Sequence, residues 1–398
     1  MKKTYLVTLL TSLFVIALLH GIAMLNGSDE RESRKVHVGF IYIGDESTPY
    51  THNFMLAQQA MESNLGTAVT VEALSNVTEE SADRYIRQLA ENGCNIIFTT
   101  SYGFSEPAKE IAKEYPDIQF CQATGDNANK EPFVSNYHTF MGRIYEGRYL
   151  SGVVAGMKLD EMIKAGKITK EQAQVGYVGA YPNAEVISGY TAFLLGIKSV
   201  VPEAKMHVEY TNTWTSYTLE KSAAQSLIDK GCVIISQHSD TIGPAVACEQ
   251  SETEVGVFHV GYNQSMIDVA PTTSLVSAKI NWEPYITKAV TAVLEDKTIE
   301  DVVKGNVRGN DIGAGVEQNW IEMLEFNDTI IAKGTKDAVE RDIKKFKKKL
   351  IAVFKGNYTG VNPDDVNDTI DLRNGYQENQ NSSAPTFHYV LQDEIFIE

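Results

Sequence analysis

A stretch in the first half of the chain recurs in the second half, and this repeat constrains the fold more than any other feature. Three strand-like segments recur in the same order at offsets of 137 or 138 residues: 38–40 as 175–177, 71–72 as 208–209, and 89–97 as 227–235. A period this long is not that of a solenoid. One α/β lobe is therefore present twice. Two similar lobes joined side by side form a cleft, and we expect function there.

Length and charge narrow the class of protein. At 398 residues the chain can form two domains of ordinary size. A formal net charge of −17 argues against a nucleic-acid partner, because a phosphate backbone repels an acidic surface. The basic run 344–349 is an exception. Its apolar neighbours recur at helical spacing over residues 338–354, which favours the solvated face of a helix.

The N-terminus has the layout of an export segment. Lys2 and Lys3 precede an uncharged run from Tyr5 to Leu25, and the polar stretch 26–35 follows. The apolar run is about long enough to cross a bilayer, so residues 1–35 are either a cleaved signal peptide with a short linker or a retained signal-anchor. In both cases the chain from about Val36 onward works outside the cytoplasm, at the cell membrane.

Cysteine placement and motif searches argue against several kinds of chemistry. Cys94 and Cys232 hold equivalent places in the two lobes, so they should lie too far apart for a disulfide, and free core cysteines are expected. No cysteine or histidine spacing resembles a zinc site. Neither a phosphate-binding loop nor a Gly-x-Ser-x-Gly motif occurs. We therefore expect no catalytic residues, metal or cofactor.

Strand and helix patterns alternate along most of the chain, which is typical of parallel sheets covered by helices. Residues 36–144 are assigned to lobe one and residues 145–281 to lobe two. Residues 282–355 should supply a crossover helix and return segments that complete the lobes. The polar stretch 357–381 looks like loop, and short strands are expected at 386–391 and 394–397. We expect residues 356–398 to pack on the lobes, since their apolar side chains need cover.

Candidate binding residues lie in the loops that follow the expected strands, because ligands of parallel α/β sheets bind at the carboxyl ends of the strands. In lobe one these loops are 44–53, 75–76, 100–105 and 124–126, and in lobe two they are 180–188, 211–216, 237–243 and 261–264. They carry aromatic and polar side chains that suit a flat ring or a sugar: Tyr50, His52, Asn53, Tyr102, Phe104 and Asp126 in lobe one, and Tyr181, Trp214, His238, Asp240 and Asn263 in lobe two.

Two alternatives remain open for these residues. The aromatic side chains could instead cap the core at the loop ends. Lys279, near the end of the strand expected over 274–280, could place a charge in the cleft or lie on the surface.

Several motifs resemble the basic membrane protein family of substrate-binding proteins of ABC importers, which includes purine nucleoside receptors. The resemblance covers residues 36–326. Its most specific part is the block 145–156 (YEGRYLSGVVAG), supported by 38–45 and by 175–179 (VGYVG). It implies a type I periplasmic-binding fold, with two lobes that close on a nucleoside or a similar small molecule.

The resemblance also implies roles for particular residues. Asp45 and Asn53 match polar residues of the family's first loop, Asp126 matches an Asp after a strand, and Trp214 falls where a family aromatic residue stacks on the base. Asn263 stands where the family usually has Asp, and an amide can donate where a carboxylate only accepts, so the preferred ligand can differ. Lys279 matches a family lysine. The cysteine of a lipid anchor is missing.

We therefore interpret the chain as an extracytoplasmic receptor that presents a nucleoside-like ligand to an ABC permease. One alternative is a membrane-anchored sensory or adaptor protein of the same fold, and another is a cleft enzyme such as a nucleoside hydrolase. A transcription regulator of the lactose-repressor type would need an N-terminal DNA-binding helix pair, and this chain has an apolar segment there instead.

Overall fold

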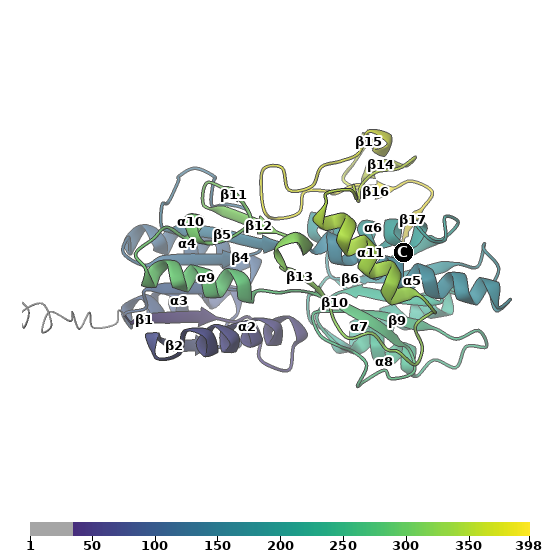
Figure 1. The fold of residues 1–398 in the computed structure, drawn as a ribbon, viewed down its shortest axis with the longest axis horizontal. Coiled ribbons are helices and arrows are strands. Elements are labelled where there is room, and N and C mark those ends of the chain that lie inside the picture. Colours follow the sequence, from purple (N-terminus) through teal and green to yellow (C-terminus); the bar gives the residue numbers. More distant parts are fainter. Residues whose placement is uncertain (1–34) are drawn as a thin grey trace, which may run out of the picture. The chain divides into compact units, whose positions relative to one another are not determined.

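A computed structural model describes residues 35–398, so the expected signal or anchor lies outside the described residues. Two seven-stranded sheets form the two lobes (Figure 1). The lobe-one sheet has the order β11-β12-β5-β4-β3-β1-β2. Its strands are β1 (Val36–Ile41), β2 (Val69–Leu74), β3 (Ile96–Thr99), β4 (Gln119–Ala123), β5 (Tyr137–Gly142), β11 (Asn306–Arg308) and β12 (Asp311–Ala314).

The lobe-two sheet repeats this arrangement in the order β13-β10-β9-β8-β6-β7-β17. Its strands are β6 (Gln174–Gly179), β7 (Lys205–Tyr210), β8 (Ile234–His238), β9 (Phe258–Tyr262), β10 (Ser274–Ile280), β13 (Ile321–Met323) and β17 (Ile395–Ile397). The duplication is confirmed, because the matched segments fall on β1 and β6, on β2 and β7, and at the starts of β3 and β8. Strands β1 to β5 and β6 to β10 pair in parallel.

Helices cover the sheets of both lobes. Lobe one carries α2 (Pro49–Leu65), α3 (Ala82–Glu91), α4 (Ser105–Glu114), α9 (Glu283–Leu294) and the short α10 (Ile299–Val302). Lobe two carries α5 (Ile144–Lys164), α6 (Ala184–Lys198), α7 (Tyr217–Asp229), α8 (Gly243–Glu249) and α11 (Thr335–Lys347). No helix among residues 35–398 is long and apolar enough to cross a membrane.

Glycines let α5 and α6 pack closely within lobe two. A Cβ atom added at Gly152 would lie 2.1 Å from the carbonyl oxygen of Phe193, and one at Gly196 would lie 2.1 Å from that of Tyr149. Real Cβ atoms do not approach backbone so closely, so a larger residue at either position would push the helices apart. This explains the glycine at position 152 of the block 145–156.

The chain passes directly from one lobe sheet to the other three times, after β5, after β10 and after β12. Buried aromatic rings pack the second and third connections against lobe one. Trp282 stacks on Phe54 of α2 with ring centroids 4.3 Å apart, and Tyr285 stacks on Phe140 of β5 at 3.7 Å. Trp320 of the third connection meets Tyr285 edge-on at 5.7 Å. These rings, which we call the connector cluster, hold the connecting segments in place.

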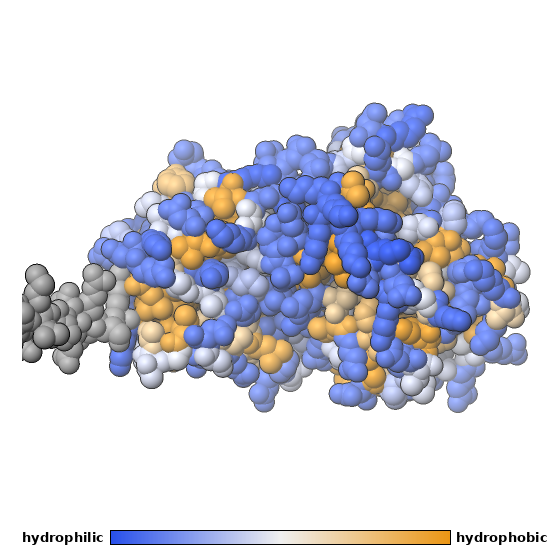
Figure 2. All heavy atoms as spheres, viewed as in Figure 1, coloured by the Kyte–Doolittle hydropathy of each residue, from blue (hydrophilic) through white to orange (hydrophobic). Residues whose placement is uncertain are grey.

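Two details differ from the sequence-based expectations. The helix with the basic run ends at Lys347 rather than Phe354, because Lys349 adopts a left-handed backbone conformation with φ of 56°. Its lysines are exposed and Phe346 is buried, so the solvated-face interpretation is confirmed, and Figure 2 shows that side as hydrophilic. Strand β5 is not evident from the sequence because its buried residues include His138 and Thr139, whose side chains find polar partners elsewhere in lobe one.

The C-terminal segment also has more structure than its composition suggests. Strands β14 (Thr359–Asn362) and β15 (Asp365–Asp371) form a hairpin where loop was expected, and β14 also pairs with β16 (Val390–Leu391). The sequence pattern does not predict the hairpin because β15 is exposed over most of its length. The strand therefore carries polar residues and has no apolar face.

Residues 356–398, which we call the tail, contact both lobes. Strand β17 adds in parallel to β7 at the edge of the lobe-two sheet. On lobe one, the Ser383 amide donates to the Asp311 carboxylate at 2.6 Å, and Arg308 donates to the Asn379 carbonyl. Phe387 is fully buried and stacks on Phe354 with ring centroids 4.4 Å apart.

We expect Phe387→Ala to lower the free energy of unfolding by about 3–5 kcal/mol, because it removes a buried ring from the contact between tail and lobes. Denaturant unfolding checks this. The matched control is Phe133→Ala, since that ring is 52% exposed and its loss should change stability by less than about 0.5 kcal/mol. Equal effects of the two substitutions would show that the tail adds no stability.

Candidate ligand-binding site

A cavity lies between the two lobes at the carboxyl ends of their parallel strands. It contains about 540 Å³ of space, counting the part open to solvent. Lobe one lines it with Ile43, Tyr50, Ser101, Tyr102 and Thr124, and lobe two with Glu185, Trp214, Thr215, His238, Asp240 and Tyr262.

Aromatic rings from both lobes form much of the wall, and neighbouring groups fix their orientation. The Tyr50 hydroxyl donates to the Thr100 carbonyl at 2.5 Å, which holds this ring across the loop after β3. Trp214 meets Tyr181 edge-on, with ring centroids 5.5 Å apart. Tyr262 meets His238 in the same way at 5.0 Å. The rings are therefore held before any ligand arrives.

His238 lies at the end of β8 and is neutral at physiological pH. Burial, and next the nearby positive charge of Arg148, lowers its pKa to about 4. Its Nε2 lies 3.3 Å from a Glu185 carboxylate oxygen. Since a carboxylate only accepts, we assign the ring proton to Nε2. The opposite atom, Nδ1, is buried and has no hydrogen-bond partner among the described residues.

Arg148 stands behind the cavity wall rather than in it. Its guanidinium lies 3.8 Å from the centroid of the Tyr262 ring, and Nη1 donates to the Gln237 carbonyl at 2.8 Å. Arg148 belongs to the block 145–156, so this helix supplies the buried charge that supports the cavity. The lining residues include no lysine or arginine.

Asp240 places a carboxyl group in the cavity without a partner. Its backbone amide donates to the Trp214 carbonyl at 2.9 Å, but its side chain forms no hydrogen bond or ion pair with a described residue. Burial, and next the negative charges of Glu220 and Glu185, raises the pKa of Asp240 well above its ordinary value. An unpartnered carboxyl group of this kind is suited to hydroxyl or amine groups of a ligand.

Five residues expected from the sequence line this cavity: Tyr50, Tyr102, Trp214, His238 and Asp240. Phe104 does not, and this is a correction. Residues 102–104 form a single 3₁₀ turn, which leaves Tyr102 58% exposed and turns Phe104 into the lobe-one core. The sequence alone gives two aromatic residues in one loop without showing which of them faces inward.

Asn53 and Asn263 are buried near the cavity but outside its lining. The Asn53 amide donates to the Ile280 carbonyl at 2.7 Å, which ties α2 to the connection after β10. Asn263 has a left-handed backbone, with φ of 66°, and its Nδ2 has no hydrogen-bond partner among the described residues.

The remaining five expected residues, Tyr181 among them, also lie outside the cavity lining. Asp45 accepts hydrogen bonds from Ser47 and Asn76, which lower the pKa of its carboxyl group. Ion pairs engage Asp126 with Lys130 at 2.9 Å, and Lys279 with Glu322 at 3.4 Å. His52 lies on α2 and is partly exposed. Ligand contact by these residues stays a prediction.

Six lining residues were not among the expected site residues: Ile43, Ser101, Thr124, Glu185, Thr215 and Tyr262. All except Ile43 fall in loops named from the repeat, and Ile43 directly precedes such a loop. The position of a loop at a strand end therefore predicted the lining residues better than residue type did. Choosing residues by type found only part of the lining.

Comparison with known proteins identifies the family to which this two-lobed chain belongs. Residues 36–354 match the sequence profile of the family described as ABC transporter substrate-binding protein PnrA-like, or Bmp. The chain belongs to this family. The match ends near the start of the tail. The tail therefore lies outside the region that the family profile describes.

Curated relatives of the PnrA-like chain differ in the ligands for which they are named. A purine-binding protein from Brucella abortus is 34% identical over 316 residues, which cover 78% of this chain and 81% of the relative. A protein from Haloferax volcanii, named for glucose binding by an ABC transporter, is 30% identical over 298 residues, covering 74% and 70%.

Solved structures of solute-binding proteins share the fold. One from Aeropyrum pernix superposes with a TM-score of 0.64 at 16% identity, covering 83% of this chain and 95% of that one. Another, from Conexibacter woesei, has a TM-score of 0.62 at 18% identity, covering 79% and 97%. The periplasmic-binding fold is therefore confirmed. The PnrA-like family is one of extracytoplasmic substrate-binding proteins, and these matches are named for ligand binding or transport rather than for catalysis.

The buried histidines of this PnrA-like protein make its stability depend on pH. Burial lowers the pKa of His238 to about 4 and that of His259 to about 3, whereas an unfolded histidine titrates near 6.5. The unfolded chain therefore binds protons first as the pH falls. The stabilisation is complete above about pH 6.5 and is lost as the pH drops toward 4, by about 1.4 kcal/mol per pH unit for each histidine.

We expect His238→Gln to flatten this loss, measured as the free energy of unfolding in denaturant at pH values between 7 and 4. The control is His388→Gln, because that side chain is 39% exposed. If His238→Gln and the control lose stability with the same slope, His238 is not held neutral by the fold.

Proposed function

We propose that this protein captures a nucleoside in the cavity between its lobes and delivers it to an ABC permease. The observation that carries the proposal is the pairing of aromatic walls with the unpartnered Asp240 carboxyl group. Aromatic faces from both lobes suit a purine ring, with Trp214 as the stacking partner. Carboxyl groups suit the ribose hydroxyls and exocyclic amines that a nucleoside presents.

The charge of the cavity supports a neutral ligand. Glu185 and Asp240 are the acidic lining residues, and His238 is neutral at physiological pH. With no lysine or arginine in the lining, a phosphate group would have no opposite charge to meet there and would face two carboxyl groups. We therefore propose that the site accepts nucleosides and disfavours nucleotides.

The two-lobed structure supports a receptor that opens and closes. A ligand that touches both lobes binds the closed form better than the open form, so it shifts the equilibrium toward closure. The permease would then recognise the closed form. The name of the relative from Brucella abortus supports a purine as the ring bound, and membership of the family supports a permease as the partner.

A hexose is the second candidate, and the relative named for glucose binding favours it. A sugar presents apolar C–H faces to aromatic rings and hydroxyls to carboxyl groups, so the same cavity chemistry suits it. What separates the candidates is the base, since only a nucleoside gives Trp214 a flat ring to stack on.

We expect purine nucleosides to raise the melting temperature of the purified protein, whereas the matching monophosphates, ribose and glucose do not. At a hundredfold excess over the dissociation constant a one-site ligand adds about 2.7 kcal/mol of stability. A rise in melting temperature with glucose alone would show that the ligand is a hexose and not a nucleoside. Equal shifts with nucleosides and nucleotides would contradict the charge argument, and turnover of a bound nucleoside would favour the enzyme alternative.

A further inference from the structure

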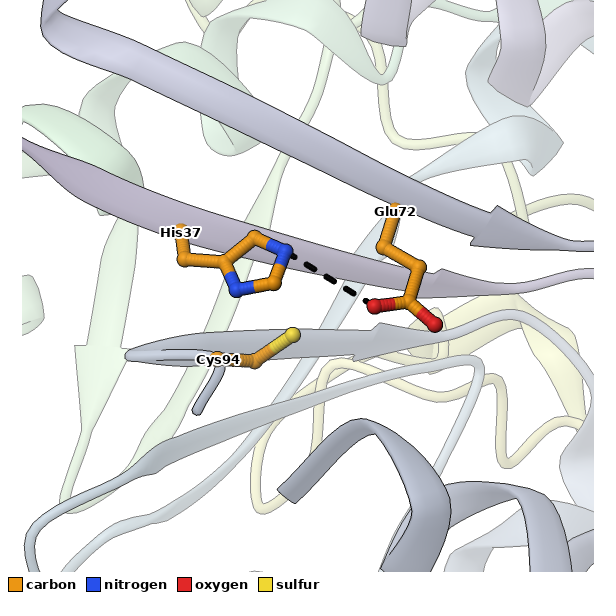
Figure 3. A group of neighbouring side chains, drawn as sticks. All are labelled: His37, Glu72 and Cys94. Atoms are coloured by element: carbon orange, nitrogen blue, oxygen red, sulfur yellow. Dashed lines mark ion pairs between the residues drawn. The ribbon is translucent and has the colours of Figure 1, made fainter. Parts of the chain in front are cut away.

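A second group of side chains with metal-binding chemistry lies in lobe one, away from the cavity. His37 is on β1, Glu72 is on β2, and Cys94 is two residues before β3 (Figure 3). Cys94 and His37 belong to the amino-terminal ends of their strands, whereas the cavity lies at the carboxyl ends. The three residues come from separate segments of the chain, so no local spacing in the sequence reveals them.

The backbone brings these side chains to one place. Glu72 pairs with Gly39 in the register of β1 and β2, so it lies on the same face of the sheet as His37, two residues before Gly39. A Cβ atom added at Gly39 would lie only 3.1 Å from the Cys94 sulfur. Gly39 therefore leaves the room that the sulfur occupies beside the other two side chains.

The donor atoms of the three side chains converge. All lie within 4.8 Å of one another, and His37 Nε2 is 3.8 Å from a Glu72 carboxylate oxygen. In a tetrahedral zinc site with bonds of 2.0–2.3 Å, neighbouring donors are about 3.6 Å apart. Small side-chain rotations would therefore bring these atoms to zinc-binding distances. Imidazole nitrogen, carboxylate oxygen and thiolate sulfur are the three ligand types that zinc uses in proteins.

Neighbouring groups orient these donors without occupying them. The Asn92 side chain donates to one oxygen of Glu72 at 2.8 Å, and the other oxygen faces His37. The Asn95 side chain accepts from the His37 backbone amide at 2.8 Å, which fixes β1 beside the loop that carries Cys94. Supporting hydrogen bonds of this kind are a regular feature of metal sites. The contact between His37 and Glu72 is too long for a hydrogen bond.

We propose that His37, Glu72 and Cys94 form a binding site for a zinc ion. The side chains of His37 and Glu72 are 28% and 29% exposed, so the ion can enter from solvent and a water molecule can take the fourth position. Burial, and next the charge of Glu72, raises the pKa of Cys94 to about 12, so the free side chain is a thiol at neutral pH. Zinc binding forms the sulfur–zinc bond and releases the thiol proton to solvent.

The duplication supplies a comparison within the same molecule. By the repeat, Gln174, Glu209 and Cys232 of lobe two take the places of His37, Glu72 and Cys94. The acid and the cysteine are present in both lobes, but only lobe one has the histidine. In lobe two the Gln174 amide is engaged, with Oε1 3.2 Å from His207 and Nε2 donating to the Glu171 carbonyl at 2.7 Å.

The test uses the full chain, purified without a polyhistidine tag and stripped with a chelator. Cobalt(II) reports a thiolate ligand through its charge-transfer absorption in the near ultraviolet, and zinc should displace it. We expect one equivalent of cobalt to give this absorption, Cys94→Ala to abolish it, and Cys232→Ala to leave it unchanged. No absorption, or its survival in Cys94→Ala, would overturn the proposal.

A second variant guards against a folding defect in Cys94→Ala. His37→Gln gives lobe one the residue found in lobe two, at a partly exposed position. It should weaken zinc binding at least about tenfold, by analogy with the loss of supporting groups at known sites. Calorimetric titration with zinc chloride measures this, and the melting temperature without metal should not change. Unchanged zinc affinity in His37→Gln would contradict the site.

Discussion

The cavity depends on the packing of the three connections between the lobes. Its lining comes from loops of two separate sheets. The segments that connect the two sheets therefore set the distance between the cavity walls. The connector cluster of Trp282, Tyr285 and Trp320 packs two of these crossings against lobe one, and the Asn53 amide binds the carbonyl of Ile280 at the start of one of them.

The tail adds a contact to both lobes. Strand β17 extends the lobe-two sheet, while Asn379 and Ser383 bind Arg308 and Asp311 of lobe one. A segment attached to both lobes moves with any change in the angle between them. Since the family profile ends at residue 354, this attachment is a feature of the present chain that lies beyond the matched region.

Burial shifts the pKa values of the ionisable residues in the cavity. It keeps His238 neutral and raises the pKa of Asp240, so the walls offer hydrogen-bonding groups with little positive charge. Arg148 supplies the compensating charge from behind Tyr262, where a ligand in the cavity does not meet it directly. These features are the basis of the proposal that the site takes a neutral ligand with a flat ring.

The repeat made the architecture predictable from the sequence. It identified equivalent strands, and the rule that ligands bind at strand ends then located the loops around the cavity. Side-chain direction within those loops was not predictable, since it depends on local turns. Tyr102 and Phe104 share one 3₁₀ turn and face opposite ways, and Asp45 and Asp126 are engaged by neighbours outside the cavity.

Elements without an apolar pattern were also missed. The hairpin β14–β15 is largely exposed and polar, and β5 hides polar residues whose partners come from distant parts of lobe one. The grouping of His37, Glu72 and Cys94 depends on the pairing of three strand segments, so no reading of residue spacing could have found it.

The dissociation constant of a purine nucleoside for Trp214→Ala, measured by calorimetric titration, tests the central claim most directly. Tyr217→Ala is the control, because Tyr217 is an aromatic residue three positions away, 45% exposed and outside the cavity lining. Stacking on a base contributes about 1–3 kcal/mol, so Trp214→Ala should weaken binding about 5- to 150-fold while the control binds like the parent protein. Equal affinity of both variants would contradict ligand binding against this wall.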